Sequence, residues 1–444
     1  MVDLPIFIHG LFGISHMQEQ KLQLRFFDIT MMVISLVIGM GIFRAPATVA
    51  QRAGSELIYY VAWITGGLIA LCGAIGFAEI GKRMPVSGAY YSIFSKAYSP
   101  TLAFAINIII LVSNSASIAG VAIIGAEYVM PYAMGLPSTF IASVFIILLY
   151  GLNLLGLRTS ATVQNILMGI KLLMLGAIIS ALGILPPTET VTAIQSHSGG
   201  MWESFGLALI AVSFTYGGYQ QTINFGGEVK ENGKMLPRAI ILGVFIIVGI
   251  YLLANLAYVQ VIGFNELAQS KFIAAIMMER LFGSTAAMIV SMVIVISVFG
   301  YVNISMLSNP RVISAMGKDG VLPKVFAQAD ERKGVSVSAL TVFTAISLIS
   351  VYAGESFEKI LNYTIFIDSI GLGVGMATLY RLKGEKLSLF SHVAALIFIS
   401  ACLFTGINIF LFDTNAGIYG SILFTCVLLM GYFVSKKKNI NPYD

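Results

Sequence analysis

The sequence predicts an all-α polytopic membrane protein with about twelve membrane-spanning helices. Hydrophobic residues make up 57% of the 444 positions and charged residues only 11%, and the mean hydropathy is +0.89. Soluble domains contain about 25% charged residues, so this composition excludes a soluble protein. A span needs about 20 apolar residues, and with short connections the chain has room for about twelve.

The apolar stretches follow one another along most of the chain, and each is expected to form one helix with boundaries good to about four residues. The expected spans are 26-52, 56-80, 100-130, 138-156, 160-185, 202-228, 237-262, 284-315, 335-352, 358-380, 389-411 and 415-435. The expected organisation is a cytoplasmic or interfacial segment (1-25), a single transmembrane domain (26-435) and a cytoplasmic tail (436-444).

Lysine and arginine orient these spans. The chain has 26 lysine and arginine residues, and most of them lie in connections between spans. These connections are cytoplasmic if both termini are cytoplasmic. The positive-inside rule therefore favours that orientation, which also requires an even number of spans. We expect a multi-pass protein of the cell (inner or plasma) membrane, surrounded by the lipid bilayer.

Several functional classes lack support in the sequence. The four histidines have no metal-ligand spacing around them, so no metal or other cofactor is expected. The spans contain neither a nucleophile with its base nor a His/Asp cluster, so we do not expect an enzyme. The three cysteines lie in apolar spans, and the outer turn from Glu127 to Pro137 has none. We therefore expect no disulfide-linked accessory subunit. A nucleic-acid partner is not expected either.

The first span is interrupted near its middle. Residues 35-46 read Ser-Leu-Val-Ile-Gly-Met-Gly-Ile-Phe-Arg-Ala-Pro. Gly39 and Gly41 each lower helix propensity by about 1 kcal/mol relative to alanine, and Pro46 cannot donate a backbone hydrogen bond. Unpaired backbone groups at membrane depth are tolerated where they line a cavity or are packed inside protein. The alternative is a continuous helix whose glycines pack closely against a neighbour.

A second interruption lies in the sixth span, at a corresponding place in the other half of the chain. Residues 214-219 read Phe-Thr-Tyr-Gly-Gly-Tyr. Paired interruptions of this kind are the best sequence indicator of a transporter binding site. Gly41 and Gly217 are expected to tolerate no bulky β-branched side chain, because binding depends on the opened backbone.

These motifs resemble the amino acid/polyamine/organocation (APC) transporter superfamily, and within it the L-type amino acid transporter branch and its prokaryotic relatives. The first similar motif is Ile38 to Phe43 followed by Pro46, in which Met40 replaces the usual serine and Arg44 is unusual. The other similar motifs are Phe214 to Gly218, Glu228 to Lys230, Pro237 to Ile240, Asn309 to Arg311 and Met316 to Pro323. Together they cover roughly residues 25 to 330.

The resemblance implies two inverted repeats of five helices, about 26-185 and 202-380, plus two further helices, about 389-435. It also implies secondary active transport by alternating access, as a permease or exchanger, with the substrate held between the broken first and sixth spans. The physics agrees, because the helix start at Gly41 carries about +0.5 charge and the helix end near Ile38 about −0.5. These ends complement the carboxylate and ammonium of a zwitterion. Without a charged side chain at either break, neutral L-amino acids are the expected substrates; Arg44 would favour an acidic one only if it pointed inward.

The residues expected to bind substrate lie at the two breaks and in the third span. They are Ile38, Gly39, Met40, Gly41, Ile42, Phe43, Phe214, Thr215, Tyr216, Gly217, Gly218 and Asn114. The resemblance implies that Phe214 is an aromatic gate, although a core-facing or lipid-facing phenylalanine is the alternative. Asn114 belongs to a polar island with Ser113 and Ser115, which either faces the interior or forms hydrogen bonds between helices.

Lys171 is the basic residue deepest in a span. An ammonium at a helix centre costs roughly 2.5 to 3.5 kcal/mol, so it is rare without a partner or a function. Snorkelling is the alternative, but Lys171 lies about 16 Å beyond Ser160 along the helix, at 1.5 Å per residue. The resemblance implies that this ammonium replaces the sodium ion of sodium-coupled relatives. Its expected partners are the carbonyls near Ile38 and the hydroxyl of Ser297, and we expect sodium-independent transport, with proton coupling left open.

Two further questions stay open at the level of sequence. Asp368 lies deep in the tenth span, where it can pair, carry protons or face a water-filled cavity. An amino-acid-gated channel or a membrane receptor or sensor is the alternative function. A channel, however, would need repeated pore-lining motifs, and a receptor would not need two broken spans.

Overall fold

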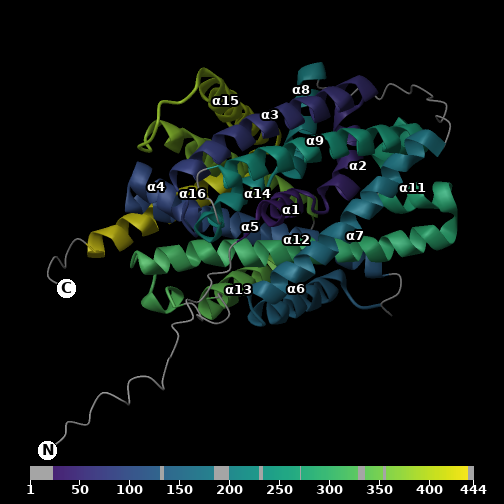
Figure 1. The fold of residues 1–444 in the computed structure, drawn as a ribbon. Helices are drawn as coiled ribbons and strands as arrows, with labels where there is room; N and C mark the ends of the chain where they lie inside the picture. Colours follow the sequence, from purple (N-terminus) through teal and green to yellow (C-terminus); the bar gives the residue numbers. More distant parts are fainter. Residues whose placement is uncertain are drawn as a thin grey trace, which may run out of the picture.

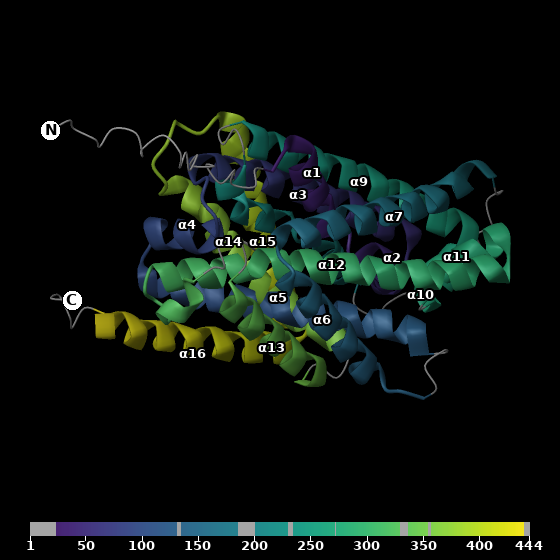
Figure 2. The ribbon, with the colours of Figure 1, turned by 60° about the horizontal axis from the view of Figure 1, so that its bottom comes forward.

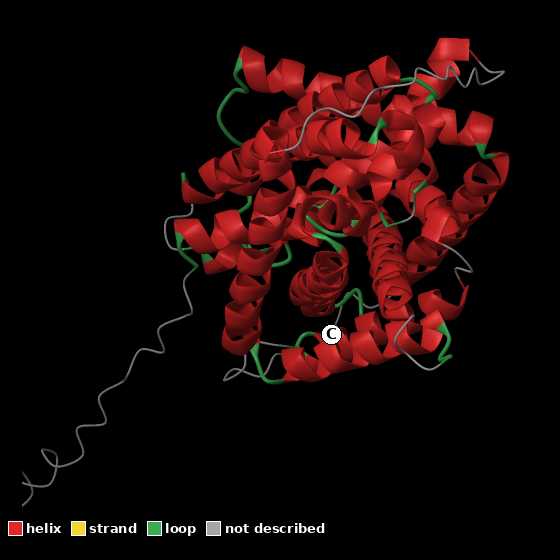
Figure 3. Ribbon diagram, turned by 90° about the vertical axis from the view of Figure 1, so that its right-hand side faces the viewer, coloured by secondary structure: helices red, strands yellow, loops and turns green. Residues whose placement is uncertain are grey.

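The computed structural model describes residues 24–130, 135–184, 200–229, 234–270, 272–328, 336–353 and 357–438. Within these residues the chain consists of helices and loops, as Figure 3 shows. Two isolated β-bridges, Leu24 with Val229 and Ser87 with Phe225, are the exceptions in the described part. The predicted all-α class is therefore confirmed.

The helices follow the order of the predicted spans. The α-helices are α1 (Phe26–Val37), α2 (Gly41–Ala53), α3 (Glu56–Arg83), α4 (Ala89–Ala97), α5 (Pro100–Val129), α6 (Ser138–Leu154), α7 (Leu157–Ile184), α8 (Gly200–Tyr216), α9 (Met235–Ile262), α10 (Phe264–Gln269), α11 (Ile273–Phe282), α12 (Ser284–Lys318), α13 (Val337–Ala353), α14 (Phe357–Ala377), α15 (Leu389–Phe412) and α16 (Thr414–Lys438). Short 3₁₀ helices are η2 (Tyr219–Asn224), η3 (Gly226–Glu228), η4 (Lys324–Phe326) and η5 (Thr378–Tyr380).

Eight helical stretches of the described chain are long and apolar enough to cross a membrane. Shorter apolar helices cover Ser138–Leu154, Val337–Ala353 and Ile365–Tyr380. These helices lie where the sequence predicts spans, which supports a polytopic membrane protein. The count of twelve, the inverted repeat and the single-domain boundaries stay predictions.

Short polar and glycine signals set the helix ends. The hydroxyl of Ser55 accepts a hydrogen bond from Ile58 N at the start of α3, and that of Ser99 accepts one from Leu102 N at the start of α5. Such caps satisfy backbone donors that have no partner within the helix. Gly54, with φ of 64°, ends α2 in the left-handed conformation that glycine adopts without strain.

The two ends of the helix bundle carry different elements. In Figures 1 and 2, α4 and the C-terminal end of α16 lie at one end, and α11 lies at the opposite end. The sequence predicts the cytoplasmic side for the first group and the outer side for α11. The arrangement is therefore compatible with the predicted orientation.

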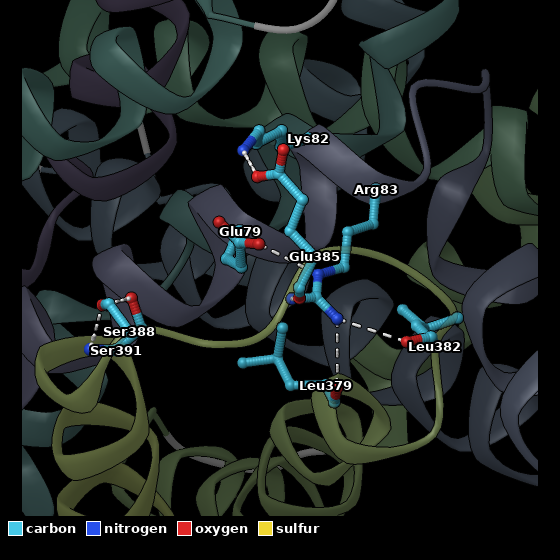
Figure 4. A network of polar contacts seen from close by, with 8 residues as sticks. All are labelled: Glu79, Lys82, Arg83, Leu379, Leu382, Glu385, Ser388 and Ser391. Atoms are coloured by element: carbon cyan, nitrogen blue, oxygen red, sulfur yellow. Dashed lines mark hydrogen bonds and ion pairs between the residues drawn. The ribbon is translucent and has the colours of Figure 1, made fainter.

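Arg83 ties the end of α3 to the loop that follows α14, as Figure 4 shows. Its Nε donates to Glu79 Oε1 at 2.9 Å, and its Nη2 donates to the Glu385 carbonyl at 2.7 Å. Its Nη1 donates to the Leu382 carbonyl at 3.2 Å. Glu79 thus holds the Arg83 side chain that joins α3 to this loop.

Candidate functional site

The first span is broken where the sequence predicts. α1 ends at Val37, Ile38 adopts φ −73° and ψ 78°, and α2 begins at Gly41. Within the break, Gly39 N donates to the Val37 carbonyl at 2.7 Å. The N–H groups of Gly41 and Ile42 stand in the first turn of α2, where no intrahelical acceptor exists. The break therefore brings a carbonyl end and an N–H end of two helices together.

The sixth span is also broken, and its second half differs from the prediction. α8 ends at Tyr216, Gly218 adopts φ of +116°, and the chain continues as η2 and η3 instead of an α-helix. A Cβ at Gly226 would lie 3.1 Å from Pro85 Cα, and one at Gly227 would lie 2.8 Å from Ser87 N. The glycines thus let this segment pack directly against the backbone of residues 85 to 87.

The two breaks touch each other through glycines. A Cβ at Gly41 would lie 3.1 Å from Thr215 Cα, and one at Gly218 would collide with the Leu36 carbonyl oxygen. At Gly217 the nearest atom would be the Phe214 carbonyl oxygen at 3.4 Å, an ordinary contact. The strict need for glycine in the second break therefore lies at Gly218, one residue after the predicted position.

A cavity lies at the breaks, with an empty volume of about 1040 Å³ including its opening to solvent. The predicted residues on its wall are Gly39, Met40, Gly41, Asn114, Phe214, Thr215, Tyr216, Gly217 and Gly218. Half-buried Phe214 lies on this wall and also packs against the hydrophobic core, so its role as a gate stays a prediction.

Three predicted binding residues do not lie on the cavity wall. The side chains of Ile38, Ile42 and Phe43 are fully buried in the hydrophobic core instead. The motif places these residues at the break, but it does not tell which way each side chain points. Arg44 is 8% exposed and is also absent from the wall, so the structure does not give it the inward direction that would favour an acidic substrate.

Sequence reasoning missed most of the wall that α14 and α15 contribute. These residues are Ile365, Asp368, Ser369, Leu372, Phe398, Ala401, Cys402 and Thr405. Asp368 was the available signal, because an acid in a span usually faces the interior or a cavity. Ser113 Oγ donates to Asp368 Oδ1 at 2.7 Å. Asp368 is the only aspartate, glutamate, lysine, arginine or histidine among the described residues of this wall.

Lys171 lies behind the first break. Its side chain is 1% exposed, and its Nζ donates to the Ile38 carbonyl, so it does not snorkel and the predicted partner is confirmed. The predicted contact with Ser297 is not formed, because Ser297 Oγ is buried without a hydrogen-bond partner in the described chain. Gly300, three residues further along α12, faces the ammonium instead, with the position of a Cβ 3.5 Å from Nζ.

Three side-chain amides form a closed ring beside the cavity. Asn114 Nδ2 donates to Asn309 Oδ1 at 2.6 Å, and Asn309 Nδ2 donates to Gln221 Oε1 at 3.2 Å. Gln221 Nε2 donates back to Asn114 Oδ1 at 3.2 Å. The ring joins α5, η2 and α12. Asn114 therefore lies on the cavity wall and also forms hydrogen bonds between helices, while its binding of substrate stays a prediction.

The whole described chain, breaks and cavity included, lies within the match to a known family. The amino acid permease family model matches residues 24–439. The chain belongs to the amino acid permease family. The predicted membership of the APC superfamily is thereby confirmed, and this permease is an amino acid transporter of the secondary active class, not an enzyme.

Relatives of the permease support the L-type branch. It is 30% identical over 373 residues to the large neutral amino acids transporter small subunit 2 of Homo sapiens, covering 80% of this chain and 68% of that protein. It is 29% identical over 376 residues to the serine/threonine exchanger SteT of Bacillus subtilis (strain 168), covering 80% and 83%. It is 26% identical over 389 residues to the b(0,+)-type amino acid transporter 1 of Homo sapiens, covering 85% and 79%.

An ion pair connects η3 to α12 in the permease. Arg311 Nε lies 2.8 Å from Glu228 Oε1, and Arg311 Nη2 donates to Glu228 Oε2 at 3.1 Å. The guanidinium carbon also lies 4.6 Å from the centroid of the Phe225 ring. Leu24 N also donates to the Glu228 carbonyl at 2.7 Å, and this hydrogen bond attaches the segment before α1 to η3. Glu228 thus connects α12 and the segment before α1 to the end of the sixth span.

Proposed function

We propose that this permease is a sodium-independent transporter of neutral L-amino acids that works by alternating access. The observation that carries the proposal is the cavity at two paired helix breaks. The N-terminus of α2 offers N–H groups and partial positive charge to a carboxylate. The carbonyl ends of α1 and α8 offer partial negative charge to an ammonium. One zwitterion satisfies both kinds of helix end.

The neutral class is supported by the wall around the breaks, where none of the described residues is a basic side chain that could hold a second carboxylate. A charged substrate side chain would need a buried countercharge. Two relatives are named for large neutral amino acids and for serine/threonine exchange, which supports this class. Phe214 is the proposed aromatic gate, because it lies on the wall at the end of α8 beside the break.

Sodium independence rests on Lys171. Its ammonium bonds to the carbonyl that ends α1 and lies against α12, so it links these helices as a bound cation would. A fixed positive charge and a sodium ion cannot share one site, because like charges this close repel strongly. We propose that the charge of Lys171 takes the place of a coupling sodium ion.

Uptake into proteoliposomes tests the proposal. The measurement is accumulation of a labelled neutral amino acid, with and without the same amino acid inside, in competition with a panel of amino acids and with sodium replaced by choline. Neutral amino acids are expected to compete, and choline is expected to have no effect. Inhibition by glutamate or arginine alone would contradict the neutral class. A substrate-triggered ion current without accumulation of the substrate would favour the amino-acid-gated channel.

We propose that the permease works without a disulfide-linked accessory subunit. One relative carries the words "small subunit" in its name, so assembly has to be tested. Support comes from the cysteines Cys72, Cys402 and Cys426, which all lie within helices of the bundle. Electrophoresis of the purified protein with and without reductant is expected to show the same mobility, and uptake is expected from the permease reconstituted alone.

A further inference from the structure

A single carboxylate faces the substrate cavity. Asp368 extends from α14 to the wall, while its Oδ1 accepts the hydrogen bond from Ser113 of α5. In the part of the chain that the structure describes, this is the only hydrogen bond to the carboxylate, and no basic residue lines the cavity. The second oxygen therefore has no protein partner that compensates a full negative charge.

An uncompensated carboxylate at this depth is costly. Ionised groups in an apolar medium are paired, hydrogen-bonded or neutralised. In an open, hydrated cavity, water can solvate the charge. When the cavity closes around a substrate, water is expelled, and the charge must be neutralised by a proton or by a cationic group of the substrate.

We propose that Asp368 is the proton-binding residue of this permease and couples entry of one proton to entry of each substrate molecule. The proposal rests on the proposed function, because the carried molecule is taken to be a zwitterion without net charge. Its two ends are already complemented by the helix breaks, which leaves Asp368 without a cationic partner from the substrate. A proton is then the remaining neutralising group.

The coupling of proton entry to substrate entry follows from the order in which the cavity is hydrated and closes. In the cavity open to the outside, the free carboxylate oxygen takes a proton from water. The neutral acid allows the cavity to close dry around the substrate. Opening to the inside restores hydration, and the proton leaves with the substrate. One cycle moves one proton and one zwitterion, so transport carries one positive charge inward.

Among the residues that the structure describes, none places a competing charge beside Asp368. The titratable groups that interact with it electrostatically are Tyr90 of α4, Tyr301 of α12 and Cys402 of α15, and all three are uncharged at neutral pH. Lys171 is absent from the cavity wall and uses its ammonium on the Ile38 carbonyl. Asp368 lies on the cavity wall and Lys171 does not, and this distinguishes Asp368 from Lys171 as the proposed proton site.

The test compares net uptake with exchange in proteoliposomes that contain a pH-sensitive dye. In the parent protein, a neutral amino acid is expected to acidify the interior, and a gradient of one pH unit is expected to support about tenfold accumulation. In Asp368→Asn, acidification and gradient-driven accumulation are expected to be lost. Counterflow exchange is expected to remain, because exchange moves no net proton and the amide stays uncharged in the closed cavity.

Two further variants sharpen the comparison. Asp368→Glu restores the carboxylate and is expected to recover acidification. Glu385→Gln removes one carboxylate at the surface, where the Glu385 side chain is 85% exposed and pairs only with partly exposed Lys82. This matched control is expected to keep both acidification and counterflow.

Each alternative outcome has a definite meaning. Absence of counterflow in the parent protein would reject the transport function and the proton role together. Counterflow without acidification in the parent, or acidification that persists in Asp368→Asn, would overturn the proton role alone. Competition by lysine or arginine that disappears in Asp368→Asn would assign the carboxylate to substrate recognition. A sodium requirement that disappears in this variant would assign it to sodium, and both results would overturn the proposal.

Discussion

In the break of the sixth span, Gly218 is the position that most strictly requires glycine. It adopts φ of +116°, and a side chain there would meet the Leu36 carbonyl of the first break. Residues other than glycine in such conformations cost of order 1 to 3 kcal/mol. We therefore expect Gly218→Ala to abolish substrate binding in a thermal-shift or uptake assay. Gly217→Ala is the matched control and is expected to keep binding; equal loss in both variants would contradict this placement.

Gly41 carries the corresponding requirement in the first break, because its Cβ position lies 3.1 Å from Thr215 Cα. Gly41→Val is expected to abolish substrate binding while the protein still inserts into the membrane. Insertion depends on the hydrophobicity of the span, whereas binding depends on the opened backbone. Membrane fractionation checks insertion, and the affinity for substrate checks binding. Affinity equal to that of the parent would show that the α1–α2 break does not form the binding site.

Lys171 gives a second test at the scale of a residue. Lys171→Ala leaves the Ile38 carbonyl without its buried donor, and an unsatisfied buried polar group costs about 1 to 3 kcal/mol. We expect uptake to fall about 5- to 140-fold, since 1.4 kcal/mol corresponds to a factor of ten. Uptake is measured in sodium and in choline. A parent protein that strictly requires sodium, or an unaffected variant, would contradict the role given to Lys171.

The same residue shows what sequence reasoning can and cannot locate. Counting from the start of the helix places Lys171 at membrane depth, and the glycine pattern places Ile38 at the end of a half-helix. Both come from local spacing. The partner on α12 depends on the rotation of that helix about its axis, and Gly300 instead of Ser297 faces the ammonium. Hydropathy does not define this rotation.

At the scale of elements, the amide ring joins α5, η2 and α12 by three hydrogen bonds. Asn309→Leu removes one member and leaves donors and acceptors of the other two amides unsatisfied, at a cost of about 1 to 3 kcal/mol. We expect a lower thermal unfolding midpoint and reduced uptake. Asn408→Leu is the control, because Asn408 Nδ2 donates to the Phe404 carbonyl of its own helix. An equal shift in both variants would argue against a special role for the ring.

The second half of the sixth span shows the limit of element prediction. The sequence predicts a span over 202-228 that is broken near residues 214-219, but it does not predict that two 3₁₀ segments follow Gly218 in place of an α-helix. The cause lies elsewhere in the chain, where the backbone of residues 85 to 87 approaches Gly226 and Gly227. Such a contact between distant segments overrides local helix propensity and leaves no periodic signal in the sequence.

At the scale of the whole molecule, the composition is sufficient to predict an all-α membrane protein. The paired helix breaks are sufficient to predict where the cavity lies. The far wall was not predictable in the same way. It comes from α14 and α15, which pack against each other and against α5 and α3. The motifs that resemble the family end near residue 330, so only Asp368 indicated that this part of the chain faces the site.

The orientation of the whole bundle gives the last prediction. α4 and the C-terminal end of α16 lie at one end of the molecule, and α11 lies at the other (Figures 1 and 2). The positive-inside rule predicts that the first end is cytoplasmic. A reporter active only in the cytoplasm is therefore expected to work when fused to either terminus, and a periplasmic or extracellular reporter at neither. A reporter inserted between α10 and α11 is expected to show the opposite pattern. Termini on opposite sides would require an odd number of spans, and the twelve-span arrangement would then be wrong.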